Sequence, residues 1–336
     1  MTTLIHNATI VNEGQQYTGS LLIENDKIAA IIRGTDIKDI VADHTIDATG
    51  QYLLPGGIDD HVHFRDPGLT HKADMASESR AAARGGITSI MDMPNCSPQT
   101  TSIETLEAKF ADAQEKCLVN HSFYLGATTD NIWEIRRVDP RTVCGVKLFM
   151  GSSTGGMLVD KKERIETIFR ESPTLIALHC EDQSIISANA TKYKEETRSD
   201  DPDVKYHPLI RSEEACYQST AQAVELAKKT GAHIHIMHIS TARELELLQQ
   251  GDISCSFGEL TVDLTGCLRC LGTLLDGPCT ALVRACGQEG DQTQQGIAGL
   301  DEPVQTGFGN TQLLHEHGLL VGIIQLSDVS LQLGTD

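Results

Sequence analysis

The chain between residues 57 and 240 repeats one pattern: a short apolar segment of strand character is followed by a longer segment in which apolar residues have helical spacing. Alternation of this kind predicts strands that lie parallel in one sheet, with helices packed outside it. We therefore predict an α/β fold, a (β/α)8 barrel of which six strands can be recognised. Those strands are predicted at residues 57–64, 86–93, 119–125, 143–150, 174–179 and 233–240.

Three helices between these strands have recognisable ends. Thr101-Ser-Ile-Glu104 has the pattern of a capping box and leads into a stripe of apolar residues with helical spacing. Asp160 is predicted to begin a second helix. Ser212 and Gly231 are predicted to cap the two ends of a third helix.

The segments on either side of this region have a different character. Residues 2–33 alternate short apolar and polar pieces separated by turn residues, which predicts a small antiparallel β-unit belonging to a β-sandwich. We therefore divide the chain into a β-sandwich portion (1–54), the six barrel strands (55–254) and a tail (255–336).

The tail has an abnormal composition. It contains no Lys, Tyr or Trp and only two Arg, yet it holds five of the ten Cys. A strand at 323–326 and a short helix at 280–286 are the elements we predict in it, and no strands that would pair with residues 2–33 are recognised. The abrupt change indicates a reading-frame shift near Ser254 or a wrongly joined gene model; a diverged but genuine C-terminal domain is the alternative.

The overall composition argues against several classes of partner. The net charge of −20 disfavours nucleic acid and anionic membrane surfaces, because both are negatively charged. No apolar run approaches the ~20 residues of a membrane span, and no secretory signal is recognised. The cysteines lack the spacing of a secreted disulfide framework, and Cys267 and Cys270 form a CxxC with no second pair to complete a zinc site. These features predict a cytoplasmic protein.

Four histidines and a lysine occupy the ends of predicted strands. His61 and His63 are two residues apart on a strand, so both imidazoles face one side and can bind one metal ion. Lys147 lies in an apolar strand, where its charge must be paired or neutralised; carboxylation by CO₂ would do this, and a lysine that reaches solvent is the alternative. His179 and His238 also lie near strand ends, at the face where barrel enzymes have their active sites.

The motifs around these residues resemble the dihydroorotases of the amidohydrolase superfamily. The similarity covers about residues 1–250 and keeps several motifs in order. These are Pro55-Gly-Gly-Ile-Asp-Asp-His-Val-His-Phe-Arg-Asp-Pro-Gly68, Gly85-Gly-Ile-Thr88, Met93-Pro-Asn95, Val146-Lys-Leu-Phe-Met-Gly-Ser-Ser-Thr-Gly155, Leu178-His-Cys-Glu-Asp182 and Met237-His-Ile-Ser-Thr-Ala242.

The resemblance implies a metal-dependent hydrolase barrel with two Zn²⁺ ions bridged by carboxylated Lys147. His61 and His63 would bind the first ion, and His179 and His238 the second; preferring His238 to His235 or His233 rests on the resemblance. Arg65 and Asn95 would bind the substrate carboxylate, a role that suits a bidentate guanidinium. The implied reaction is the reversible hydrolysis of dihydroorotate to N-carbamoyl-aspartate in pyrimidine synthesis. A homo-oligomer is left open.

Two other functions remain as alternatives. Allantoinases and hydantoinases share the histidines and the lysine, but their substrates lack the ring carboxylate, so Arg65 disfavours them. A catalytically silent subunit that supports a partner enzyme is the second alternative, although such relatives usually lose metal ligands.

The family's catalytic acid-base residue is not recognised in this chain. The resemblance implies an Asp before a His on the last barrel strand, where it would bind metal and move the proton. No Asp in the tail precedes a His, and the family's Asn-Pro substrate contact is not found either. Because six strands would also leave two unpaired sheet edges, we expect poor solubility and little activity.

Overall fold

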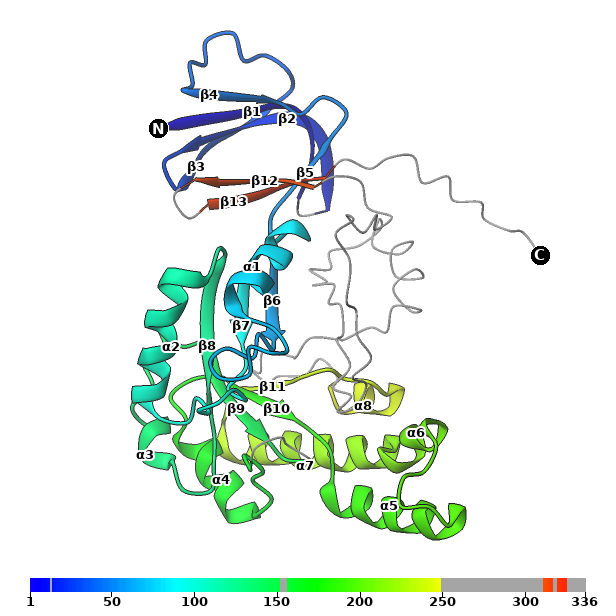
Figure 1. Ribbon diagram of the computed structural model, residues 1–336. Coiled ribbons are helices and arrows are strands. Elements are labelled where there is room, and N and C mark those ends of the chain that lie inside the picture. The colour runs from blue at the N-terminus through cyan, green and yellow to red at the C-terminus, as the bar shows by residue number, and fades with distance from the viewer. Residues whose placement is uncertain (13, 152–155, 249–310, 317–318, 325–336) are drawn as a thin grey trace, which may run out of the picture.

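The computed structural model describes residues 1–12, 14–151, 156–248, 311–316 and 319–324, which form two sheets (Figure 1). The predicted helix at 280–286 and the predicted frame shift near Ser254 lie outside these residues. Among the helices that the structure describes, none is long and apolar enough to cross a bilayer.

The N-terminal sheet confirms the predicted β-unit. β1 (Thr2–Asn12), β2 (Gln15–Glu24) and β3 (Lys27–Arg33) are antiparallel neighbours, and only two residues of the sequence separate each strand from the next. β4 (His44–Asp47) and β5 (Tyr52–Leu54) both pair parallel with β1. A small apolar core holds this sheet together, made by Ile5, Ala8, Ile10, Leu21, Ile23, Ala48 and Leu53.

Two strands from the tail belong to the same sheet, where they lie next to β5 and not next to residues 2–33. β12 (Thr311–Glu316) and β13 (Leu319–Ile324) form an antiparallel hairpin, and β13 pairs antiparallel with β5. β13 overlaps the strand predicted at 323–326 in its first two residues and begins earlier, and residues 325–326 lie outside the described residues. Strands that close the N-terminal sheet were not recognised in the sequence because their partner, β5, lies more than 250 residues away.

The second sheet contains the six predicted parallel strands in sequence order. They are β6 (Gly57–Val62), β7 (Ile87–Asp92), β8 (Asn120–Gly126), β9 (Gly145–Phe149), β10 (Ile176–His179) and β11 (Ile234–Ile236). Only two residues separate β5 from β6, so the N-terminal sheet lies at the amino ends of the barrel strands (Figure 1). The carboxyl ends point away from it.

The parallel sheet is curled, as a barrel requires. In a flat sheet, the first and sixth strands would lie about 24 Å apart, because neighbouring strands are separated by 4.7–4.9 Å. Instead, Oδ2 of Asp60 on β6 is 3.2 Å from Nε2 of His235 on β11. The fold class is therefore confirmed as α/β, a half-barrel beside a separate N-terminal sheet.

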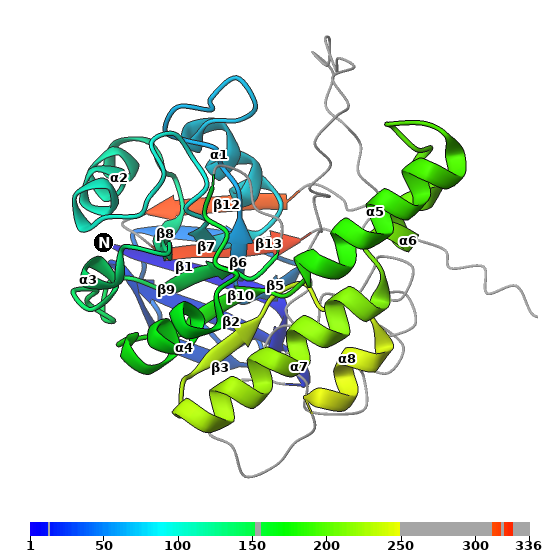
Figure 2. The same cartoon turned by 90° about the horizontal axis from the view of Figure 1, so that it is seen from below.

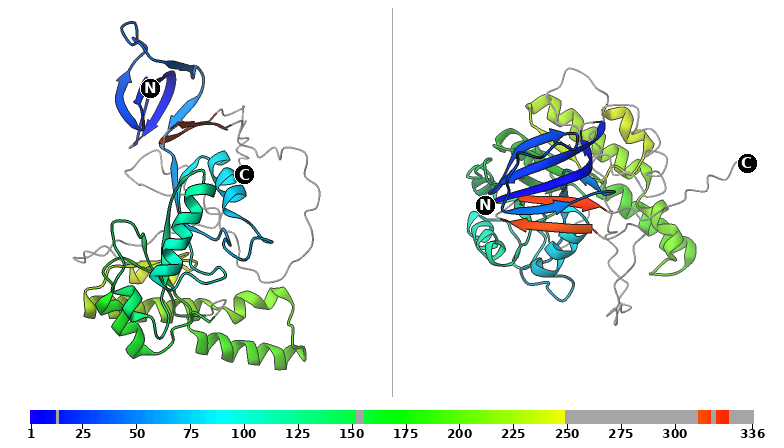
Figure 3. Two further views of the ribbon diagram at one scale, coloured as in Figure 1. Left: turned by 60° about the vertical axis from the view of Figure 1, so that its left-hand side comes forward. Right: turned by 90° about the horizontal axis from the view of Figure 1, so that it is seen from above.

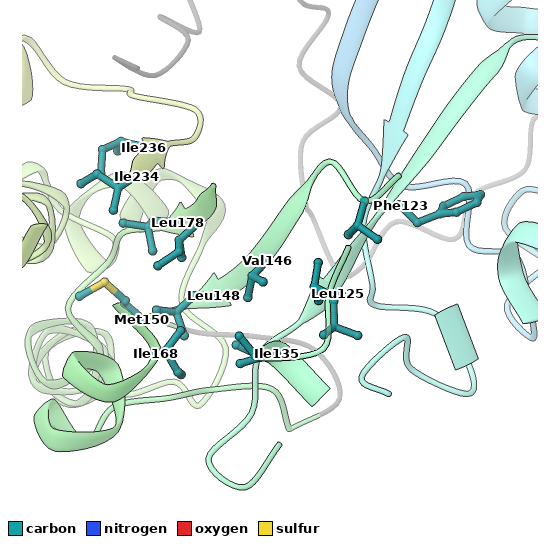
Figure 4. Close-up of a cluster of buried hydrophobic side chains, with 14 of the residues drawn as sticks. Phe123, Leu125, Ile135, Val146, Leu148, Met150, Ile168, Leu178, Ile234 and Ile236 are labelled. Carbon is teal, nitrogen blue, oxygen red and sulfur yellow. The ribbon is translucent and has the colours of Figure 1, made fainter. Parts of the chain in front are cut away.

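Side chains alternate between the two faces of the curled sheet, as the period of a strand dictates. Phe123, Val146 and Leu178 face outward into the large core beneath the helices (Figure 4). Tyr124 and Ala177, the residues next to them, face inward into a small cluster. The apolar side chains of the outer face are buried beneath helices. These helices are α1 (Met75–Arg84), α2 (Ile103–Lys116), α3 (Ile132–Ile135), α4 (Lys162–Glu171), α7 (Glu213–Thr230) and α8 (Ala242–Leu247).

A helical excursion separates β10 from α7. It comprises α5 (Gln183–Thr197), the 3-10 turn η1 (Val204–Tyr206) and α6 (His207–Ile210). Figures 2 and 3 show α5 projecting beyond the helices that cover the sheet.

The predicted helix ends are correct for α7 and shifted by one residue elsewhere. Ser212 caps α7 through the N–H of Ala215, and Gly231 ends it with a positive φ of 74° that suits glycine. The cap of α2 is Ser102, which exchanges hydrogen bonds with Thr105, because Thr105 rather than Glu104 occupies the third helical position. α4 begins after Lys161, not Asp160, and has no side-chain cap.

Candidate metal centre

The first imidazole pair lies at the carboxyl end of β6. His61 is the penultimate strand residue and His63 follows the strand, and their Nε2 atoms are 3.2 Å apart. Two nitrogens bound to one tetrahedral zinc at 2.0–2.1 Å would be about 3.3 Å apart. The spacing of this pair therefore fits two ligands of one metal ion.

The second pair comes from β10 and the segment after β11. Nδ1 of His179 is 2.9 Å from Nε2 of His238, which again suits two ligands of one ion. The ring centroids of His238 and His61 are 5.5 Å apart, so the two pairs are adjacent. The structure thus brings together all four histidines singled out in the sequence.

His238 reaches this position by an unusual backbone conformation. β11 ends at Ile236, and His238 has a positive φ of 42°, which is uncommon for a residue with a side chain. His235 stays on the strand and contacts Asp60 instead. The geometry therefore agrees with choosing His238, which strand alternation alone could not have decided.

Lys147 lies inside the half-barrel on β9, with 1% of its surface exposed. Its Nζ is 3.2 Å from Sδ of Met237, the residue before His238, and 4.8 Å from the centroid of the Phe149 ring. The alternative of a lysine that reaches solvent does not hold. The amine lies among apolar and aromatic groups beside the second histidine pair.

The four histidines would suit a two-metal centre only if another group supplied further ligands. Within the described residues, no group of three or more His, Cys, Asp or Glu side chains has the arrangement of a metal site. Each imidazole pair would supply two ligands, so a further ligand would come from another group. A carboxylated Lys147 would supply oxygen ligands, whereas a protonated amine binds no metal.

Arg65 and Asn95, the two residues predicted to bind the substrate carboxylate, contact one another near the end of β6. Arg65 has a positive φ of 60°, and its Nη1 donates to the backbone oxygen of Asn95 over 3.2 Å. The Asn95 residue is 5% exposed. This contact holds the guanidinium near the end of β6, two residues beyond His63.

A buried ion pair that sequence reasoning missed holds these two segments in place. Nζ of Lys109 on α2 lies 2.7 Å from Oδ2 of Asp92, and both side chains are 1% exposed. Lys109 also donates to the backbone oxygen of Met93, and Asp92 Oδ1 accepts the N–H of Phe64. The signal was present as a lysine on the apolar side of a helix, but its partner is distant in sequence.

A second missed pair contacts His179 directly. Nε2 of His179 is 2.7 Å from Oε2 of Glu181, and Nε of Arg211 donates to Oε1 of Glu181 over 2.9 Å. Burial raises the pKa of Glu181, but hydrogen bonds from His179 and Arg211 outweigh it and lower the pKa to about 2. Glu181 is therefore an anion next to His179.

Comparisons with known proteins agree with this geometry. Residues 50–244 match the family described as Dihydro-orotase-like. The chain is 33% identical to the dihydroorotase of Methanosarcina acetivorans over 250 residues, covering 73% of this chain and 52% of that protein. It is 31% identical to the dihydroorotase of Lactobacillus helveticus (74% and 56%) and 30% identical to the L-hydantoinase of Paenarthrobacter aurescens (78% and 58%).

Solved structures show the same architecture. The crystal structure of L-hydantoinase (dihydropyrimidinase) from Arthrobacter aurescens is similar, with a TM-score of 0.68 and 28% identity. The similarity covers 73% of this chain and 54% of that one. The chain thus spans about half the length of the relatives it matches.

Proposed function

Because this chain belongs to the dihydroorotase-like family, we propose that its half-barrel is the metal-binding part of a cyclic amide hydrolase that acts on dihydroorotate. The proposed reaction is the reversible hydrolysis of the ring amide to N-carbamoyl-aspartate, a step of pyrimidine synthesis in the cytoplasm. The relatives support the reaction class. The choice of substrate depends on residues of this chain, since both dihydroorotases and an L-hydantoinase are among them.

The observation that carries the proposal is the adjacency of two imidazole pairs at the carboxyl ends of β6, β10 and β11. His61 and His63 would hold one zinc ion, and His179 and His238 a second, with carboxylated Lys147 between them. When bound, the two ions would supply Lewis acidity toward the ring carbonyl. The position of Lys147 inside the half-barrel, with 1% of its surface exposed, places its amine where a carboxylated side chain would face the histidine pairs.

Arg65 supports dihydroorotate over a hydantoin as the substrate. Its guanidinium can bind a ring carboxylate through two hydrogen bonds, and the contact with the Asn95 backbone orients it. Hydantoin and allantoin offer no such carboxylate. The residue would then bind and orient the ring so that its amide faces the histidine pairs.

Ligand binding tests this assignment without depending on turnover. We expect Arg65→Met to weaken N-carbamoyl-aspartate binding to the zinc-loaded chain about 10–100-fold in calorimetry, because a hydrogen bond to a charged group contributes about 1.5–3 kcal/mol. Arg141→Met is the matched control, since Arg141 is exposed and pairs with Asp139 far from the histidines. Equal binding by both variants, or tighter binding of hydantoin than of N-carbamoyl-aspartate, would contradict the substrate assignment.

A silent subunit is the second candidate function, favoured by one observation. The family's catalytic Asp is not recognised in the sequence, so we expect slow turnover even if metal and substrate bind. About two zinc ions per chain together with hydrolysis at an ordinary enzymatic rate would exclude the silent subunit. Zinc binding without measurable hydrolysis would favour it.

A further inference from the structure

The two ring nitrogens of His179 contact different groups, an imidazole on one side and a carboxylate on the other. Nδ1 faces Nε2 of His238, and Nε2 faces the Glu181 carboxylate at 2.7 Å. A carboxylate accepts hydrogen bonds and cannot donate one when ionised, so the ring proton belongs on Nε2. The lone pair is then on Nδ1, on the side of the second histidine pair.

Glu181 is in turn held by Arg211, whose Nη2 also lies 3.5 Å from Nε2 of His179. The Arg211 Nε donates to Oε1 over 2.9 Å, and Nη2 contacts Oε2, so the guanidinium grips both carboxylate oxygens. The Glu181 side chain is 9% exposed and that of Arg211 is 28% exposed. A gripped, largely buried carboxylate has little freedom to turn away from His179.

The helical excursion begins and ends at this ion pair. Asp182, next to Glu181, caps the start of α5, and Arg211 caps the end of α6. The ion pair between Glu181 and Arg211 therefore connects the two ends of the projecting segment that Figure 2 shows. The same Glu181 contacts His179 of the second histidine pair.

We propose that Glu181 and Arg211 are positioning residues for the second metal ion: together they hold His179 as its Nε2–H tautomer, with the Nδ1 lone pair directed to the metal. The inference rests on the proposed function, since it presumes that His179 and His238 bind a metal. Neither residue is among the proposed metal ligands. Removing a group that hydrogen-bonds the other ring nitrogen of a metal-binding histidine typically weakens metal affinity about 10–100-fold.

Zinc affinity tests the proposal without using activity. Metal-free chain, first incubated with bicarbonate, is titrated with zinc against a chromophoric chelator, and the same is done for Glu181→Ala and Arg211→Met. We expect one of the two zinc equivalents to bind about 10–100-fold more weakly in both variants, with the other unchanged. Glu171→Ala is the matched control, because Glu171 pairs with Arg136 on the surface and should leave both affinities as they are.

A spectroscopic measurement separates positioning from a general effect on folding. Nitrogen-15 NMR of the imidazoles reports the tautomer of each histidine, and the His179 signals are identified by their loss in His179→Asn. We expect the Nε2–H tautomer in the unaltered metal-free chain. A stable Nδ1–H tautomer, or variants that bind both zinc equivalents within threefold of the parent, would overturn the inference alone. A parent chain that binds no zinc would overturn the proposed function with it.

Discussion

Replacing Lys109 by Met should destabilise the chain strongly, because it leaves the buried carboxylate of Asp92 without its counter-ion. The Lys109 and Asp92 side chains are each 1% exposed, and their charged atoms are 2.7 Å apart. Methionine fills a similar volume but offers the Asp92 carboxylate no counter-ion. Removing one partner of a buried pair costs about 3–5 kcal/mol. We expect a loss of that size in the free energy of unfolding.

Urea denaturation followed by circular dichroism measures this loss. With a slope of about 3 kcal/mol per molar urea, the midpoint should fall by about 1–1.7 M. Arg170→Met serves as the control, since Arg170 is 50% exposed and pairs with Glu166 along one helix face. Exposed pairs of this kind contribute only about 0.3–0.5 kcal/mol, so the control should barely shift the midpoint.

The double variant Lys109→Met/Asp92→Asn makes the reasoning refutable. Asparagine is uncharged and its amide oxygen can still accept the Phe64 N–H, as Asp92 does over 2.9 Å. The double variant should therefore lose less stability than the sum of the two single changes. Two results would contradict this reasoning: a loss below about 1 kcal/mol in the free energy of unfolding of Lys109→Met, or a loss in the double variant that equals the sum of the two single losses. Either would show that the Lys109–Asp92 ion pair does not hold α2 against the end of β7.

Four further outcomes are expected. His61→Ala should lower the zinc content from about two ions per chain to about one in elemental analysis; an unchanged content would contradict the first ligand pair. Asp182→Ala should cost about 1 kcal/mol at pH 6, because Asp182 caps α5 through Ser184 and Ile185. Burial raises the pKa of Asp182, but hydrogen bonds from Ser184 and Ile185 outweigh this effect and hold the pKa below its usual 3.8. The stability that the charged cap contributes is therefore present above pH 3.8 and is lost as the pH falls through the lowered pKa. A cost that persists at pH 2 would contradict the charged cap. Burial raises the pKa of the Cys180 thiol to about 12, so alkylation at pH 8 should be far slower in the folded chain than in urea, as mass spectrometry can show; equal rates would mean the thiol is accessible. Resequencing codons 250–260 should reveal a frame error, and an intact frame would favour a genuine, diverged tail.

The strands and most of the site residues could be predicted because their signals are local. Apolar runs alternating with helical spacing placed all six parallel strands. His61 and His63 could be paired because two residues on one strand face the same way. Arg65 and Asn95 were named through family motifs, and the structure brings them together beside those histidines.

The contacts that support the site were not predictable in the same way. Lys109 and Asp92 are 17 positions apart, and Glu181 and Arg211 are 30 apart, with no repeating pattern to relate them. The pairing of β13 with β5 crosses most of the chain. Such partners are chosen by packing between elements, which no single segment encodes.

His238 shows where the two kinds of information divide. The sequence by itself determined that an apolar strand near residue 235 carries several histidines and belongs to the parallel sheet. Strand alternation places His235 with Met237 on the inner face and would turn His238 outward. The family motifs named His238, and only the tertiary structure gives the physical reason: the strand ends at Ile236, and a positive φ at His238 turns its ring toward His179. Periodicity holds only while the backbone stays extended, and where it stops, packing around the chain sets the torsion angles that aim the side chain.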